Sequence, residues 1–286
     1  MLMSTFRLVQ ISDTHLSRSH AYFQDNWEAC ITHLCDDPPD LVVLSGDIAF
    51  NAPDVPDDLA FAREQFERLP VPWLVIPGNH DVGEPGENPR LGQKISSESI
   101  AIWKQQFETD CFCHDAGHWR FIGLNSEVLG SGLPEEAEQW AYFANALATR
   151  DGRQIMLFVH KPLYVDDPSA SNIGGACIHP EPRARLIGQL REAGARLVTN
   201  GHHHAYHHSQ LDEMHLVWAP TTAFINPSLT WPVETTVRAG LIEWQFSGDE
   251  VTHELIEPGL VANIDITNWT RTSGTSISLP PRALRG

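Results

Sequence analysis

The chain has 286 residues, of which 42% are hydrophobic and 20% charged, which is enough to bury a full core in one large domain. Its 19 Lys and Arg against 37 Asp and Glu leave a formal net charge of −18, which disfavours nucleic acid or an anionic membrane as a partner. No apolar run approaches the ~20 residues that cross a bilayer, and the N-terminus lacks the pattern of a signal peptide. Five cysteines, an odd number, fit a reducing compartment, so we expect a cytoplasmic protein.

Apolar runs alternate with mixed segments along most of the chain, which predicts βαβ units and a parallel sheet covered by helices. Strands are expected at 6–11, 41–44, 73–76, 120–124, 155–159 and 196–199, and helices at 25–35, 57–69, 97–107, 134–148 and 182–193. Later short strands at 216–219 and 240–246 are typical of hairpins. After Pro258 the chain loses charge, so we expect a domain at 1–258 and a C-terminal tail or arm at 259–286, either packed or mobile.

Five polar clusters each follow one of the predicted strands. They are Asp13-Thr14-His15, Gly46-Asp47, Gly78-Asn79-His80-Asp81, His160 and Gly201-His202-His203-His204. Ligands collect at the carboxyl ends of strands in open α/β sheets, so we expect the clusters to converge on one edge. The spacings of 34 and 32 residues between Asp13, Asp47 and Asn79 match βαβ units and predict neighbouring strands. Carboxylate, imidazole and carboxamide groups without thiolates suit Mn, Fe, Co or Zn.

At these clusters the sequence closely resembles the calcineurin-like metallophosphoesterase superfamily, whose blocks D-x-H, G-D, G-N-H-D/E, H and G-H-x-H occur here in the same order. The resemblance covers about residues 6–246 and implies an α/β fold, a four-layer α/β/β/α sandwich with two mixed sheets. It also implies two divalent transition metal ions, Mn, Fe or Zn, as cofactors. By position, one ion is expected on Asp13, His15, Asp47 and His204, and the second on Asp47, Asn79, His160 and His202.

The resemblance implies separate roles for the residues of the Gly78–Asp81 cluster. His80 is not a ligand in the family pattern; it is expected to bind substrate, and to stabilise the transition state or protonate the leaving oxygen. Asp81 is expected to orient His80 through the other ring nitrogen, which makes His80 and Asp81 the predicted catalytic residues. Asn79 adds a neutral oxygen ligand beside the substrate. Two metals ~3.5–4 Å apart can share a hydroxide and clamp a phosphate for in-line displacement, and their charge would attract an anion to an acidic protein.

Each cluster taken singly has an ordinary structural explanation. Gly-Asp is a common turn, the Gly78-Asn79 pair tolerates φ > 0, and a lone His160 at a strand end is more often a hydrogen-bonded edge residue. Their joint order favours the metal site. Two other patterns are set aside: Cys177 and Arg183 have the spacing of a cysteine phosphatase loop, but prolines between them cannot donate N–H groups.

The second pattern set aside is Cys111-Phe112-Cys113-His114, which lacks a further Cys pair at zinc spacing, so we expect thiols that are at least partly buried. The side chains of the histidine run at 202–208 are expected to point in different directions. Alternate side chains point the same way, so His202 and His204 can both face the metals while His203 faces elsewhere. For His203, and for His207 and His208 further along, a structural role is favoured, and a contact with substrate stays open.

The branch of the superfamily is suggested by a few positions. Phe50 stands where purple acid phosphatases place a metal-binding Tyr, which disfavours that branch. The compact length, the Asp-x-His block and residues 158–163 are similar to the bacterial branch that contains cyclic-nucleotide and glycerophosphodiester phosphodiesterases. We therefore expect hydrolysis of small phosphodiesters by in-line attack of a metal-bridging hydroxide.

Alternatives are a phosphomonoesterase acting on a small organic phosphate, a noncatalytic metal-binding scaffold and, disfavoured by the charge, a nuclease. A small phosphate ester is the expected partner, no membrane is expected, and a homo-oligomer stays open. Substrate choice is expected in the loops at 83–93, 125–133, 161–179 and 205–213.

Overall fold

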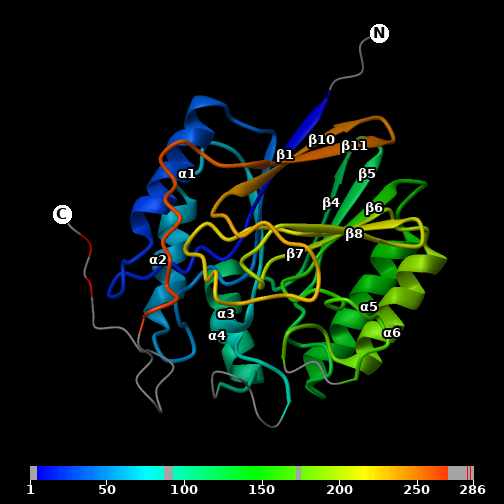
Figure 1. The fold of residues 1–286 in the computed structure, drawn as a ribbon. Coiled ribbons are helices and arrows are strands. Elements are labelled where there is room, and N and C mark those ends of the chain that lie inside the picture. The colour runs from blue at the N-terminus through cyan, green and yellow to red at the C-terminus, as the bar shows by residue number, and fades with distance from the viewer. Residues whose placement is uncertain (1–4, 87–92, 172–174, 270–281, 283, 285–286) are drawn as a thin grey trace.

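The computed structural model describes residues 5–86, 93–171, 175–269, 282 and 284, which form two sheets with helices outside them (Figure 1). The strands are β1 (Phe6–Ile11), β2 (Leu41–Ser45), β3 (Trp73–Ile76), β4 (Phe112–Ala116), β5 (Trp119–Gly123), β6 (Gln154–Phe158), β7 (Leu197–Asn200), β8 (His207–Leu211), β9 (Met214–Trp218), β10 (Leu241–Ser247) and β11 (Glu250–Ile256). The helices are α1 (Gln24–Asp36), α2 (Asp57–Phe66), α3 (Asn79–Val82), α4 (Ser97–Phe107), α5 (Pro134–Ala148) and α6 (Pro180–Glu192).

Both sheets are mixed. The first has the order β11-β10-β1-β2-β3, in which β1, β2 and β3 are parallel and β10 runs antiparallel to β1 and β11. The second has the order β4-β5-β6-β7-β9-β8, with antiparallel strands at both edges of a parallel centre. The prediction that Asp13, Asp47 and Asn79 follow neighbouring strands is confirmed, since these residues come after β1, β2 and β3.

Three clusters of buried side chains hold the layers together. One packs α1, α2 and α4 on the outer face of the first sheet, and a second packs α5 and α6 on the outer face of the second. The third lies between the two sheets, where the ring centroids of Trp119 and Phe246 are 5.0 Å apart. Helix, sheet, sheet and helix therefore follow one another, so the predicted four-layer α/β/β/α sandwich is confirmed (Figure 1).

The position of each strand in its sheet explains which strands the sequence predicted. Every residue of β2 is buried because layers cover both faces of the sheet there, which gives an uninterrupted apolar run. The edge strands β4, β8 and β11 were not predicted because exposed polar residues interrupt each of them. The interpretation of residues 205–213 as a substrate loop is therefore wrong for β8, which occupies five of them, His207–Leu211.

The cysteines behave as ordinary side chains. All five lie in described parts of the chain and are free thiols. Cys111 precedes β4 and Cys113 lies in it, so that segment pairs with β5; Cys113 is exposed, contrary to expectation. Cys177 is buried beside the equally buried Arg183, and burial raises the pKa of the Cys177 thiol, which does not suit a phosphate-binding nucleophile. No helix within the described ranges is long and apolar enough to cross a bilayer.

The first part of the C-terminal tail packs against the domain. The side chain of Asn26 donates to the carbonyl oxygens of Thr222 and Ala262, both at 2.9 Å, and accepts from the Ala262 N–H at 2.9 Å. Ile225 donates to the Ile264 carbonyl at 2.9 Å. Residues 259–269 are thus tied to the loop after β9, whereas residues 270–281 lie outside the described part.

We predict that Asn26→Ala lowers the free energy of unfolding by about 2–3 kcal/mol, because it leaves buried backbone groups of the tail and the domain unpaired. Urea unfolding monitored by circular dichroism measures the change. Asn145→Ala, on the exposed side of α5, is the matched control and should unfold as the wild type does. Equal midpoints for both variants would contradict a stabilising role for this contact.

Candidate metal centre

The five polar clusters come from the carboxyl ends of strands of both sheets rather than from the edge of one. Asp13, Asp47 and Asn79 follow strands of the first sheet, whereas His160 follows β6 and His202 follows β7 of the second. The expectation of a single sheet edge is corrected in this respect, because the chain crosses to the second sheet after α4. The site therefore depends on how the two sheets are packed together.

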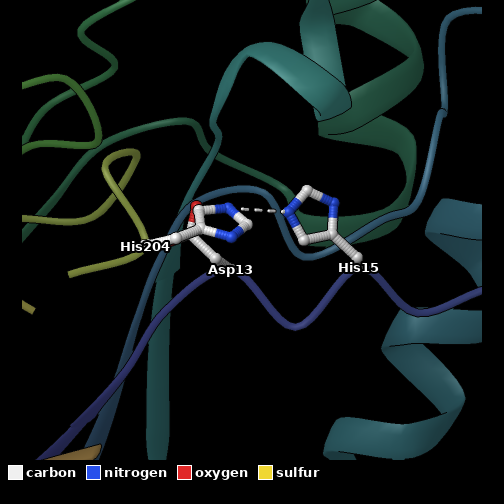
Figure 2. Close-up of side chains that lie close together, drawn as sticks. All are labelled: Asp13, His15 and His204. Atoms are coloured by element: carbon white, nitrogen blue, oxygen red, sulfur yellow. Dashed lines mark hydrogen bonds and ion pairs between the residues drawn. The ribbon is translucent and has the colours of Figure 1, made fainter. Parts of the chain in front are cut away.

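Three of the predicted ligands form a first group (Figure 2). His204 Nε2 lies 3.2 Å from Asp13 Oδ1 and 3.3 Å from His15 Nε2. Asp47 Oδ2 lies farther from this group, 4.0 Å from His15 Nε2. Asp13 and His15 are buried, so their ligand atoms are shielded from bulk water.

The other predicted ligands form a second group around His160. His160 Nε2 lies 3.2 Å from Asp47 Oδ2, 3.2 Å from His202 Nδ1 and 3.3 Å from Asn79 Oδ1. The structure thus brings together all seven residues predicted to bind metal. Asp47 Oδ2 contacts both groups, which is the position that a bridging carboxylate requires.

The ring nitrogens that point away from the centre fix the tautomers. His160 Nδ1 lies 3.0 Å from the Ser45 carbonyl oxygen, and His204 Nδ1 lies 3.1 Å from that of Phe224. A carbonyl only accepts, so each of these nitrogens donates and leaves the Nε2 lone pair for the centre. His202 uses Nε2 toward the Gly175 carbonyl at 3.3 Å, which leaves Nδ1.

Acceptor atoms therefore face one another across the centre. His160 Nε2 faces the oxygens of Asp47 and Asn79, and His202 Nδ1 faces the same His160 nitrogen. Such an arrangement is repulsive unless a cation or an additional proton lies among these atoms. The donor set and its convergence fit divalent metal ions with nitrogen and oxygen ligands.

The local electrostatics also favour a cation. Burial opposes a charged His160, yet the Asp47 and Asp13 carboxylates outweigh it and raise the pKa of the His160 imidazole to about 10. Burial also opposes a charged Asp47, but His160 and His80 hold the pKa of the Asp47 carboxyl well below its usual value. A proton on His160 would take the place of a metal ion, so the carboxylates around this ring favour positive charge there.

The backbone is strained at the predicted ligands. Asp13, His15, Asp47, His202 and His204 have φ of 53°, 44°, 49°, 73° and 53°. Only eight non-glycine residues of the described ranges have positive φ, so five of the eight belong to this site. The left-handed conformation costs a side-chain-bearing residue roughly 1–3 kcal/mol. Strain concentrated at so few positions is typical of a functional site.

Two motif glycines make room for the ligands. A Cβ at Gly78 would overlap the backbone and carboxylate of Asp47 and lie 2.8 Å from the His160 ring. A Cβ at Gly201 would overlap the side chains of Ser12 and Asp13. Hydrogen in place of a side chain therefore permits this spacing of metal ligands.

The predicted contact between Asp81 and the His80 ring is wrong. His80 Nδ1 lies 2.8 Å from the Phe50 carbonyl oxygen, which leaves Nε2 as the other ring nitrogen. Asp81 instead accepts from the backbone N–H groups of Ala49 at 2.8 Å and Gly78 at 2.7 Å. The reason is the short helix α3, which turns the Asp81 carboxylate back toward Gly78, the residue just before the helix. Asp81 therefore connects the loops that carry Asp47 and Asn79.

His80 also lies close enough to the metal centre to be considered as a ligand. Its backbone N–H donates to Asp47 Oδ1 at 2.8 Å, and His15, Asp47 and His80 form a third group whose ligand atoms lie within 4.8 Å of one another. The assignment of His80 to substrate rather than to metal stays a prediction. A variant that separates metal binding from turnover can decide between the two roles.

The histidine run divides as the alternation predicted. His202 and His204 face the metal centre, whereas His203 Nε2 lies 2.8 Å from the Ala176 carbonyl oxygen. His207 Nδ1 lies 2.7 Å from the Glu234 carbonyl oxygen, and His208 Nε2 lies 2.9 Å from His215 Nδ1. These contacts give His203, His207 and His208 structural partners.

A cavity of about 160 Å³ opens beside the metal centre. From the centre it is lined by Asp47, Asn79, His80, His202 and His204. Most of the remaining lining comes from residues 224–237 and from Ile266 of the tail. The four loops expected to select substrate supply none of the described lining residues. Sequence reasoning missed this wall because isolated aromatic residues between two strands give no periodic signal.

Comparison with known proteins adds an independent observation. Residues 6–206 match the family model described as calcineurin-like phosphoesterase. The chain belongs to the calcineurin-like phosphoesterase family. Within this family, it is 27% identical over 217 residues to a probable glycerophosphodiester phosphodiesterase, GpdQ, of Arcobacter nitrofigilis, covering 69% of this chain and 71% of that protein. A probable cyclic nucleotide phosphodiesterase of Moraxella catarrhalis is 30% identical over 179 residues, covering 56% of this chain and 59% of that protein.

These two relatives support the similarity to the bacterial phosphodiesterase branch of the calcineurin-like family. A solved purple acid phosphatase, PPD1 of yellow lupin, shares the fold with a TM-score of 0.66 at 18% identity, covering 92% of this chain and 53% of that one. This chain thus spans about half the length of the lupin phosphatase. At that identity the likeness concerns the fold alone.

We predict that Gly78→Ala weakens Mn²⁺ binding by about tenfold or more, because a methyl group there displaces Asp47 and His160. Isothermal titration calorimetry measures the affinity, and circular dichroism checks that the variant is folded. Gly188→Ala is the control, since this glycine lies in α6 with open space around its Cβ position, and its substitution should leave the affinity unchanged. Wild-type affinity in Gly78→Ala would argue against a metal site at these residues.

Proposed function

We propose that this protein is a dinuclear metal-dependent phosphodiesterase that hydrolyses small phosphodiesters of the cyclic-nucleotide or glycerophosphodiester type. The observation that supports it most is the sharing of Asp47 Oδ2 between two groups of predicted ligands. Family membership supports phosphoester hydrolysis, and the names of the two bacterial relatives favour diesters. The site would take Mn, Fe or Zn on nitrogen and oxygen ligands.

When bound, two such ions supply Lewis acidity toward a phosphate oxygen and lower the pKa of a water molecule. Only two of the seven expected ligands are carboxylates, so the loaded site keeps a positive charge. That charge would attract a phosphate ester to a chain whose formal net charge is −18. An anionic substrate therefore does not require a basic surface.

The residues of the chain would hold the reacting groups in place. The Asn79 Oδ1 atom faces His160, which leaves the Asn79 amide N–H groups to donate to a phosphate oxygen. The Phe50 carbonyl holds the His80 ring through Nδ1, so that Nε2 can donate a proton to the leaving oxygen. Asp81 acts as a positioning residue, because it joins the backbone that follows Asp47 to the backbone that precedes Asn79.

The reaction balances with water as the only co-substrate. A water oxygen forms a bond to phosphorus, and the bond from phosphorus to one ester oxygen breaks in line with it. That ester oxygen takes a proton from Nε2 of the His80 imidazolium, and the proton lost by the water restores the imidazolium. The products are an alcohol and a phosphate monoester. Comparison of aryl diester with aryl monoester hydrolysis at equal metal loading separates this function from a phosphomonoesterase.

For Asp47→Ala, we expect loss of bound metal together with loss of hydrolysis of bis(p-nitrophenyl) phosphate, because both groups of ligands lose their shared oxygen. Metal content by mass spectrometry and release of p-nitrophenol are the two measurements. Asp249→Ala removes an exposed carboxylate and should change neither. Full activity in Asp47→Ala would overturn the assignment, and a wild type that binds no Mn²⁺ would favour a noncatalytic scaffold.

His80→Ala should behave differently, with metal retained and kcat reduced by ~10²-fold or more, the usual scale for a lost acid–base group. The exposed His118→Ala variant is the control and should keep wild-type kcat. If metal content falls together with kcat in His80→Ala, His80 is a ligand instead, as the third group of convergent atoms allows.

A further inference from the structure

The part of the cavity away from the metal centre is apolar. Among the described residues, it is lined mainly by Phe224, Leu229, Trp231, Val237 and Ile266, and the polar residues beyond the centre are Asn226 and His203. Of the residues that the structure describes, no Lys or Arg lines this cavity. A second phosphate or a carboxylate on the substrate would find no cation there. A polyhydroxyl group would leave most of its hydroxyls without partners, which is costly in a mainly apolar site.

Trp231 presents a flat surface that is held in place before any ligand binds. Its ring stacks on His203, with centroids 4.0 Å apart and an angle of 28° between the planes. The Trp218 ring packs edge-on against both rings. Its centroid lies 5.8 Å from that of Trp231 and 4.2 Å from that of His203. His203 is itself buried and bonded to the Ala176 carbonyl, so the structural role of His203 is to support Trp231.

Phe224 gives a second aromatic surface that is continuous with the metal centre. Its ring centroid lies 4.3 Å from that of His204 and 5.0 Å from that of Phe23. Phe23 is stacked in turn on Trp269 of the tail, at 6.0 Å and 12°. Rigid aromatic walls bind flat rings at low conformational cost, because few rotamers are lost on binding.

Asn226 adds one directed polar group to the apolar wall. Its Oδ1 accepts from the N–H and the hydroxyl of Ser228 and from the hydroxyl of Thr267. The Asn226 amide N–H groups are therefore the side of this residue that is available to a ligand. They suit an acceptor atom on a ring, such as a ring nitrogen or a carbonyl oxygen.

On the basis of the proposed function, we propose that this cavity binds an uncharged aromatic ring carried by one alcohol of the phosphodiester, as in a nucleoside or aryl ester. Aromatic walls also bind quaternary ammonium groups. Here, however, the cavity opens onto the metal centre, and two dications would repel a cationic group. Asp47, the one carboxylate among the described lining residues, belongs to that centre. The neutral ring is therefore favoured over a choline group.

The test compares three cyclic phosphates that share the same five-membered ring, so that the bond that breaks is alike in all of them. In adenosine 2′,3′-cyclic phosphate that ring is fused to the ribose that carries adenine. In the cyclic phosphate of 1-phenylethane-1,2-diol it carries a phenyl group, and in glycerol 1,2-cyclic phosphate a hydroxymethyl group. With Mn²⁺-loaded wild type, we expect kcat/KM at least tenfold higher for the two ring-bearing esters than for the glycerol ester.

The variants locate that preference. Trp231→Ala should lower kcat/KM about tenfold or more for the ring-bearing esters and less than about twofold for the glycerol ester, and Trp231→Phe should restore most of it. Leu260→Ala, 74% exposed and outside the cavity, should change nothing. A loss in Asn226→Ala that is confined to the adenosine ester identifies the ring as a nucleobase, whereas an unchanged adenosine ester identifies a simple aryl group.

Several results would overturn the inference. These are equal kcat/KM for the three esters in wild type, an equal loss for all three in Trp231→Ala, or a Trp231-dependent hydrolysis of glycerophosphocholine in place of the ring-bearing esters. If the wild type hydrolyses neither these esters nor bis(p-nitrophenyl) phosphate, the proposed function fails by itself. The cavity is then tested by calorimetry, in which phenylphosphonate should bind at least tenfold more tightly than methylphosphonate, and equal affinities would contradict the ring-binding cavity.

Discussion

The rest of this structure depends on one constraint: hydrogen-bond acceptor atoms with lone pairs converge on the buried carboxylate of Asp47. Asp47 Oδ2 faces His160 at 3.2 Å and His15 at 4.0 Å, and its Oδ1 is bonded to the backbone of the next loop. Acceptors held this close are stable only around positive charge. This arrangement constrains the local backbone. Five ligands have left-handed backbone, which is strained, and two positions must be glycine because a Cβ would not fit. The packed cores of the sandwich must outweigh these costs.

The two-sheet architecture explains why such a site is rigid. The first sheet supplies the carboxylates and the carboxamide, the second supplies three imidazoles, and the core between the sheets fixes their distance. Outer carbonyls of Ser45 and Phe224 fix the rings. The tail also fixes the cavity wall. Ile266 lines the cavity, and the Phe23–Trp269 stack completes a wall that begins at His204. Metal chemistry and ring recognition would then share one preorganised surface.

The polar clusters that meet at this site could be found from the sequence because each follows an apolar strand and contains residue types with distinct chemistry. The assignment of ligands to two metals and the four layers were implied by the resemblance to the calcineurin-like superfamily. Edge strands such as β8 and β11 were missed, since most of their residues are polar and their pairing is set by distant neighbours. The Asp81 contact was mistaken because sequence order does not reveal that α3 turns this carboxylate toward Gly78. The cavity was missed because Trp231 becomes a binding surface only through its packing on His203.

Anomalous scattering from a crystal grown with Mn²⁺ would test the central claim most directly. We expect two manganese peaks per chain, both within bonding distance of the Asp47 carboxylate, roughly 2.0–2.2 Å for a carboxylate ligand. One peak should be bound by Asp13, His15 and His204, and the other by Asn79, His160 and His202. A single peak, or two peaks that share no Asp47 oxygen, would contradict it.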